Sequence, residues 1–182
     1  FVRSNYPQAI VEQLWDNPGG IWYNLGMICE NARAARRIFE QESVWRRDPA
    51  GLAKCYSAEM ARTAASANLF LRLAQALRAC RDMRYEGETN VQTVRDSASE
   101  LRRALEEMDA AILAVETGLP AYMGPSLIRE LTLQRRFGWT FLEELESAIS
   151  AVETGQSGSI PELKCMETHE VRWVGKVHRG DD

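Results

Sequence analysis

Residues 90–118 carry the most regular hydrophobic period of this 182-residue chain, and this period constrains the fold more than any other feature. Apolar residues recur there in alternating steps of three and four, at Val91, Val94, Ala98, Leu101, Leu105, Met108, Ile112 and Val115. This spacing places them on one side of an α-helix, as in the seam of a coiled coil. Charged residues occupy the other side, so we expect a helix with one buried and one solvated face.

Three further segments show helical periodicity between turn signals. We expect helices over about 21–45, 52–84 and 126–155, and a short helix before the breaker Asn17-Pro18-Gly19-Gly20. The segment 52–84 has two apolar stripes, which predicts burial on two sides and a place in the middle of the fold. The sequence therefore predicts an all-α protein, an up-and-down bundle of four long helices with a short N-terminal helix.

The expected inner seam of the helix over 21–45 is also periodic. It comprises Ile21, Leu25, Ile28, Ala32, Ala35 and Phe39. We expect these side chains to face the rest of the bundle.

The composition changes after Gly155. The run Gln156-Ser157-Gly158-Ser159 is typical of a flexible linker. Apolar and charged residues then alternate over 170–178, which indicates a strand or an extended arm. The predicted organisation is a helical bundle domain over 1–155, followed over 156–182 by a linker and an extended C-terminal arm.

Two segments, 105–118 and 142–155, are similar in sequence, and both end in Val-Glu-Thr-Gly. One interpretation is the duplication of a helical unit. The other is that two helix ends meet the same packing and capping demands. We expect Gly118 to end its helix in the left-handed conformation, with Pro120 preventing continuation.

The overall composition is that of an ordinary globular protein, with 45% hydrophobic residues and a formal net charge of -4. No run of about eighteen apolar residues is present, so we expect no membrane span. The four cysteines are widely scattered, which favours buried thiols in a reducing compartment over a disulfide framework. The cytoplasm is the expected location.

No catalytic or nucleotide-binding motif stands out, so we assign no catalytic residues and no cofactor. Cys165, His169 and His178 are candidate zinc ligands, but their spacing matches no closed zinc module and a fourth ligand is not evident. The expected helices contain no histidine, which excludes the usual di-iron site of helical bundles. We therefore expect no metal.

Arginines of the second expected helix form the best basic cluster of the sequence. The cluster consists of Arg33, Arg36, Arg37 and Arg47. Guanidinium groups suit phosphate or carboxylate partners, so a nucleic-acid contact is one interpretation. A solvated face balanced by neighbouring acidic residues is the other.

Two parts of the chain have apolar or aromatic residues where surface is expected. The connection 119–125 includes Tyr122 and Met123, and the predicted arm includes Val171 and Trp173. Tryptophan is enriched at interaction hot spots. We therefore predict partner binding by Trp173, Val171, Tyr122 and Met123.

The favoured function is a non-enzymatic protein-protein interaction or scaffold subunit of a larger assembly. In this hypothesis the bundle is the platform, the arm is the docking element, and other protein subunits are the partners. One alternative is a small helical subunit that contacts nucleic acid through the arginine-rich face. Another is an enzyme with a pocket between helices. Self-association as a homo-oligomer also stays open.

Two stretches resemble the bacterial alpha-E domain family. They are Asp16-Asn17-Pro18-Gly19-Gly20-Ile21 with Leu25 and Glu30-Asn31-Ala32-Arg33-Ala34-Ala35-Arg36, and Gly138-Trp139-Thr140-Phe141-Leu142. Together they cover about a fifth of the chain. The resemblance implies an all-helical protein associated with peptide-ligase-like and transglutaminase-like partners, without established catalytic residues.

Overall fold

The computed structural model describes residues 21–41, 46–48, 51–85, 91–160 and 163. Within these ranges the chain forms four helices and no strand: α2 (Ile21–Phe39), α4 (Leu52–Tyr85), α5 (Val91–Gly118) and α6 (Gly124–Glu153). The prediction of an all-α fold is confirmed. The predicted short N-terminal helix and most of the predicted arm lie outside the described residues.

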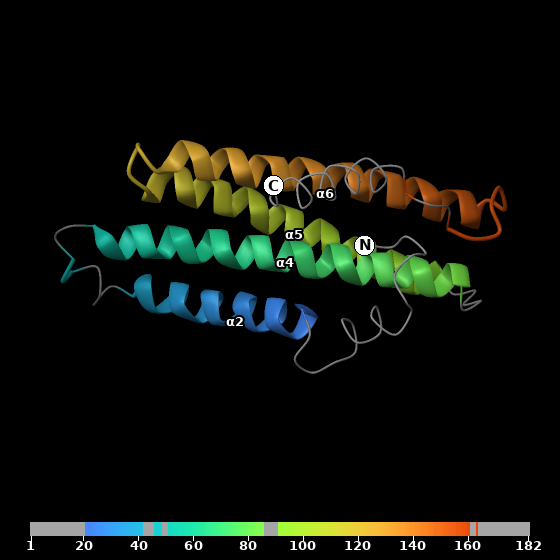
Figure 1. Cartoon of the computed structure of the whole chain (residues 1–182), viewed down its shortest axis with the longest axis horizontal. Helices are drawn as coiled ribbons and strands as arrows, with labels where there is room; N and C mark the ends of the chain where they lie inside the picture. Colours follow the sequence, from blue (N-terminus) through green and yellow to red (C-terminus); the bar gives the residue numbers. More distant parts are fainter. Residues whose placement is uncertain (1–20, 42–45, 49–50, 86–90, 161–162, 164–182) are drawn as a thin grey trace, which may run out of the picture.

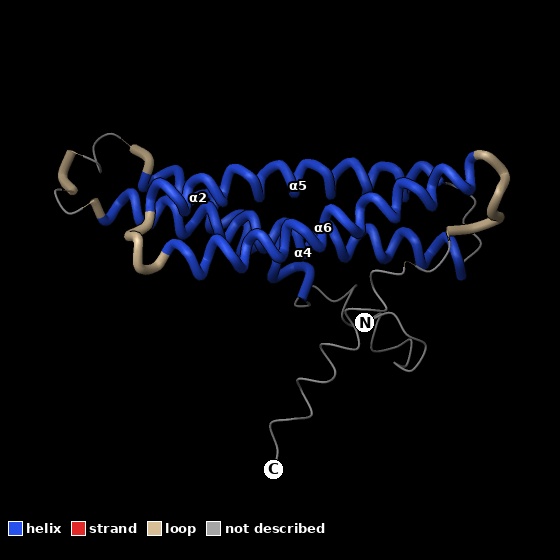
Figure 2. The backbone as a smooth tube through the Cα atoms, turned by 90° about the horizontal axis from the view of Figure 1, so that it is seen from above, coloured by secondary structure: helices blue, strands red, loops and turns tan. Residues whose placement is uncertain are grey.

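The four helices extend along nearly the same direction and lie side by side (Figures 1 and 2). The backbone of α4 packs against α2, α5 and α6, which confirms that this helix lies in the middle of the fold. The backbone of α2 lies close to that of α4 but not to that of α5 or α6. One side of α2 is therefore left without a described neighbour.

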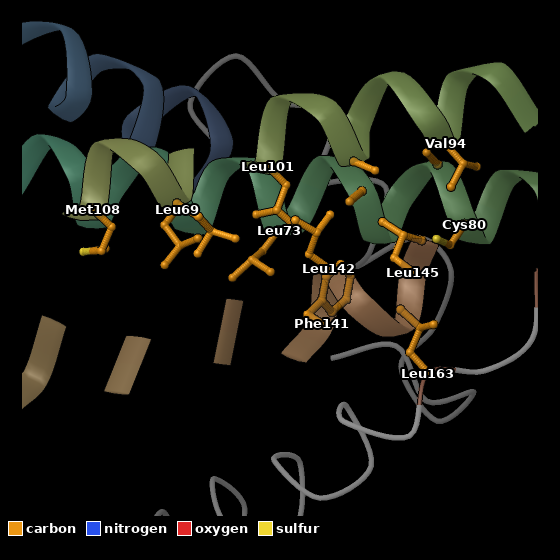
Figure 3. Close-up of a cluster of buried hydrophobic side chains, with 14 of the residues drawn as sticks. Leu69, Leu73, Cys80, Val94, Leu101, Met108, Phe141, Leu142, Leu145 and Leu163 are labelled. Atoms are coloured by element: carbon orange, nitrogen blue, oxygen red, sulfur yellow. The ribbon is translucent and has the colours of Figure 1, made fainter. Parts of the chain in front are cut away.

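The hydrophobic core is built by α4, α5 and α6 (Figure 3). The predicted seam of α5 is confirmed, since six of its eight residues are buried and Val91 and Ile112 pack against the core. Leu69 and Leu73 from α4 and Phe141 and Leu142 from α6 meet this seam. None of the α2 residues whose side chains are described belongs to this cluster, so α2 packs against the outside of a core built mainly by the other three helices.

The predicted inner seam of α2 is wrong at Ile28, whose side chain is 44% exposed, whereas Cys29 beside it is 3% exposed. The helix is turned so that Cys29 and Ala32 face α4. Because residues four apart share a helix face, this rotation also places Arg33 near Cys29, on the flank from which it reaches α5. The helix ends at Phe39, before the predicted end at Trp45, which lies outside the described residues.

The similar segments 105–118 and 142–155 have the same packing pattern but different ends. Gly155 has φ +73°, and its N–H donates to the carbonyl of Val152 while the next N–H donates to Ala151, which forms a Schellman cap. Gly118 is helical, so the predicted left-handed cap is wrong there. A Cβ at Gly118 would lie 2.7 Å from the Cβ of Ala58, so glycine at this position allows α5 to approach α4 closely.

The core extends beyond Gly155, because Ile160 and Leu163 are buried and belong to the same cluster as Phe141 and Leu145 (Figure 3). The division of the chain at residue 155 stays a prediction. A cut made at that point would remove two core side chains.

Candidate functional site

A polar junction joins α2, α4 and α5. Arg33 of α2 donates from Nε to Glu107 Oε1 at 3.1 Å and from Nη2 to Oε2 at 2.7 Å. Asn68 of α4, which is buried, donates from Nδ2 to Glu107 Oε2 at 2.7 Å. The carboxylate of α5 thus receives a bidentate guanidinium and a buried amide, and this geometry fixes the position of α2 over the other two helices.

The chemistry of this junction is that of a structural contact. The hydrogen bond that Arg33 donates to Glu107 raises the pKa of Arg33, so the guanidinium stays charged. Burial raises the pKa of the nearby Cys29 thiol, which opposes formation of the nucleophilic thiolate. Since both oxygens of Glu107 already accept hydrogen bonds, the carboxylate is engaged with the protein's own donors.

The structure does not gather the predicted basic cluster into one surface. Arg33 is held by Glu107, and Arg36 pairs with Glu40 at 2.7 Å. Arg37 and Arg47 are exposed, the first on α2 and the second in the connection that follows. Two of the four positive charges are therefore balanced at short range, which favours the interpretation of a solvated and internally paired face.

Ion pairs also join the outer faces of α5 and α6. Arg102 pairs with Glu146 at 2.6 Å, and its guanidinium lies 5.6 Å from the centre of the Trp139 ring. Arg95 pairs with Glu153, and Arg135 pairs with Asp109 on the same side. In these three pairs the charge of each arginine is balanced at short range by a carboxylate of the neighbouring helix. Trp139 accordingly acts in packing between the two helices.

The turn between α5 and α6 presents Tyr122 and Met123 to solvent, with side chains 84% and 43% exposed. The N–H groups of Met123 and Gly124 both donate to the carbonyl of Pro120, at 2.9 and 3.1 Å. Helix α6 begins at once, with proline in its first turn. The two predicted partner-binding residues therefore lie together on a short, internally bonded turn at one end of the bundle.

The other two predicted partner-binding residues, Val171 and Trp173, lie outside the described residues, as do Cys165, His169 and His178. Over the described ranges, no group of three or more His, Cys, Asp or Glu side chains is placed to hold a metal ion. None of the described helices is long and apolar enough to cross a membrane. Among the described residues, Cys29, Cys55 and Cys80 form no disulfide bond.

Two features were missed from the sequence. The first is the Arg33–Glu107–Asn68 junction, which a single sequence does not reveal because it joins residues 74 and 39 positions apart. The second is the outer side of α2, where Tyr23 and Ile38 are each 56% exposed and Met27 is 42% exposed. The signal for it was a second apolar period in 21–39, parallel to the one assigned to the core.

No protein-family model matches the chain, and no curated protein or solved structure is significantly similar to it. The resemblance to the alpha-E domain family stays a prediction. Within its second stretch, the structure gives packing roles to Gly138 and Phe141. A Cβ at Gly138 would lie 2.6 Å from Leu105 Cδ2, and Phe141 is fully buried.

Proposed function

We propose that this protein is a non-enzymatic subunit that binds other proteins, with the turn at Tyr122 and Met123 as one contact. The observation that carries the proposal is the exposure of these two large side chains on a turn fixed by two hydrogen bonds to Pro120. A rigid turn loses little conformational entropy on binding. Tyrosine is also among the residues that dominate interface energies.

The bundle supports this role by its stiffness. Long helices packed along one direction, with interhelical ion pairs such as Arg102–Glu146, hold the turn at a fixed end of an elongated body. We propose for the whole chain an up-and-down bundle with an extended C-terminal arm that contributes Val171 and Trp173 to docking. A reducing compartment, the cytoplasm, is proposed because the three described cysteines form no disulfide bond.

The two alternative functions have less support. Nucleic-acid binding through the arginine cluster would require Arg33 and Arg36 to leave their carboxylate partners. Catalysis would require an uncommitted carboxylate or nucleophile in a recess. The residues at the polar junction are instead bonded to one another.

The test is capture of partners from the native cells by the full chain and by the double variant Tyr122→Ser/Met123→Ser. The matched control is Leu133→Ser, which removes another exposed large side chain, on the outer side of α6. We expect the double variant to lose partners that the wild type and Leu133→Ser retain, with no change in helical circular dichroism. Equal recovery of every partner by all three proteins would contradict the proposal. A separate Trp173→Ala variant tests the arm.

A further inference from the structure

The outer side of α2 has a second helical stripe, opposite the side that packs on α4. It runs through Met27, Asn31, Ala34 and Ile38, in steps of four, three and four. Met27 and Ile38 are 42% and 56% exposed, and Cys29 and Ala32 on the other side are buried. This spacing is that of a coiled-coil seam with one polar position.

The stripe is complementary to itself in the antiparallel direction. If two such helices cross with Asn31 of each opposite Ala34 of the other, Ile38 of each also lies opposite Met27 of the other. Asn31 is then paired with the smaller Ala34, and Ile38 with the more flexible Met27. Both layers of paired side chains suit knobs-into-holes packing. On one flank of this pair, the exposed Ile28 of each helix faces Ala35 of the other.

The charges on the other flank agree with the same register. Glu30 and Arg37 are both exposed and lie on the same edge of the stripe, one heptad apart. In the antiparallel register defined by the apolar layers, the two equivalent edges meet, and Glu30 of one helix faces Arg37 of the other. The two-fold symmetry produces this opposite-charge pair twice. In a parallel pair the same residues would not meet.

We propose that a second copy of this chain covers the outer side of α2, through an antiparallel α2–α2 contact centred between Asn31 and Ala34. The contact is isologous, with the same residues contributed by both copies. This inference goes beyond the proposed function, because it concerns α2 and not the turn at Tyr122 and Met123. If one of the two proposals is contradicted by its test, the other is not affected.

The test uses the full chain and the variants Glu30→Arg, Arg37→Glu and Glu30→Arg/Arg37→Glu, in sedimentation velocity over about 1 µM to 1 mM. We expect the wild type to form a dimer with rising concentration. Each single variant brings like charges together at two places, so we expect its dissociation constant to rise about tenfold. The double variant restores opposite charges and should dimerise as the wild type does.

A mixture of the Glu30→Arg and Arg37→Glu variants tests the proposed register most specifically. The Glu30→Arg chain then presents two arginines to two glutamates of the Arg37→Glu chain, so a heterodimer should form with near wild-type affinity. Ile38→Gln should abolish dimerisation, and Glu106→Arg, an exposed reversal on α5, should not affect it. All variants are checked for unchanged helical circular dichroism.

Three results would overturn the proposal. The first is a wild type that stays monomeric at every concentration. The second is a dimer whose dissociation constant is the same in the wild type and the charge-reversal variants. The third is a loss of dimerisation in the single variants that is not reversed in the double variant or in the mixture. The first result would indicate that α2 is covered by another segment of this chain or by a different protein.

Discussion

Arg33 of α2 and Glu107 of α5 form a bidentate ion pair across the middle helix, with Nη2 and Oε2 2.7 Å apart. Through this ion pair α2 contacts α5 in addition to its neighbour α4. Because none of the described α2 side chains belongs to the main hydrophobic cluster, the position of α2 depends on this pair more than it would in an evenly packed bundle. Asn68, bonded to the same carboxylate, ties α4 into the contact.

Replacing Glu107 with glutamine should destabilise the protein by about 1 kcal/mol, a modest value because both ion-pair partners are partly exposed. The neutral amide has one accepting oxygen in place of two, so it cannot accept all three hydrogen bonds that Arg33 and Asn68 donate to the carboxylate. Urea unfolding measures the loss. The matched control is Glu106→Gln, an exposed neighbour on the same helix. Equal stability of the two variants would show that the junction adds nothing.

Gly118 and Gly155 should respond differently to the same substitutions. Alanine at Gly155 must adopt a positive φ, so we expect a loss of about 1 kcal/mol, and asparagine, which tolerates that conformation, should restore most of it. At Gly118 the obstacle is the Cβ of Ala58, so alanine and asparagine should both cost about 1 to 3 kcal/mol. Thermal unfolding of the four variants distinguishes the two causes. Rescue by asparagine at Gly118 would contradict the packing account.

Ile160 should contribute to stability although it follows the predicted linker. It is fully buried in the main cluster, so Ile160→Ala should cost about 2 to 4 kcal/mol. Leu133→Ala, an exposed position, should cost less than about 0.5 kcal/mol. Chemical denaturation of both variants provides the comparison. If Ile160→Ala were as stable as Leu133→Ala, residues past Gly155 would not be part of the folded core.

Cys29 should make the protein less stable in alkaline solution. Burial raises the pKa of its thiol in the folded state above the ordinary value of 9.0, so the folded chain holds this proton more tightly than the unfolded chain. The resulting stability is complete below the unfolded pKa and is lost as the pH rises through the folded pKa. Between about pH 8 and pH 10, Cys29→Ala should therefore lose less stability than the wild type.

Urea midpoints across this range provide the measurement, with Cys55→Ala as the control for removal of a half-buried thiol. A Cys29→Ala protein with the same alkaline loss as the wild type would show that this thiol does not couple to folding in that range.

The sequence was sufficient to predict the helices and most of the core, because the periods of α5 and α6 are long and one-sided. It was less reliable for α2, where apolar residues occur on both sides and periodicity does not say which side meets the bundle. Ile28 was placed inward and Cys29 is the buried residue, because contacts with α4 and the reach of Arg33 toward Glu107 set the rotation. Such contacts join distant parts of the chain and leave no local pattern.

The candidate sites were predicted to different extents. Tyr122 and Met123 stand out in the sequence because an apolar connection between helices is unusual, and both side chains are exposed; partner binding by them stays a prediction. Whether the positive charges of the arginine cluster are paired could not be determined from the sequence. The sequence shows that Arg33 and Arg36 are charged, but their carboxylate partners Glu107 and Glu40 appear only when the helices are packed.

The turn between α5 and α6 is the surface proposed to contact another protein. The most direct measurement is photocrosslinking in the native cells, with a photoreactive amino acid at Tyr122 and, separately, at Leu133 as the matched exposed position. We predict covalent adducts from position 122 to a small, reproducible set of proteins, identified by mass spectrometry and absent from position 133. Adducts of equal yield and identity from both positions, or none from position 122, would contradict the account.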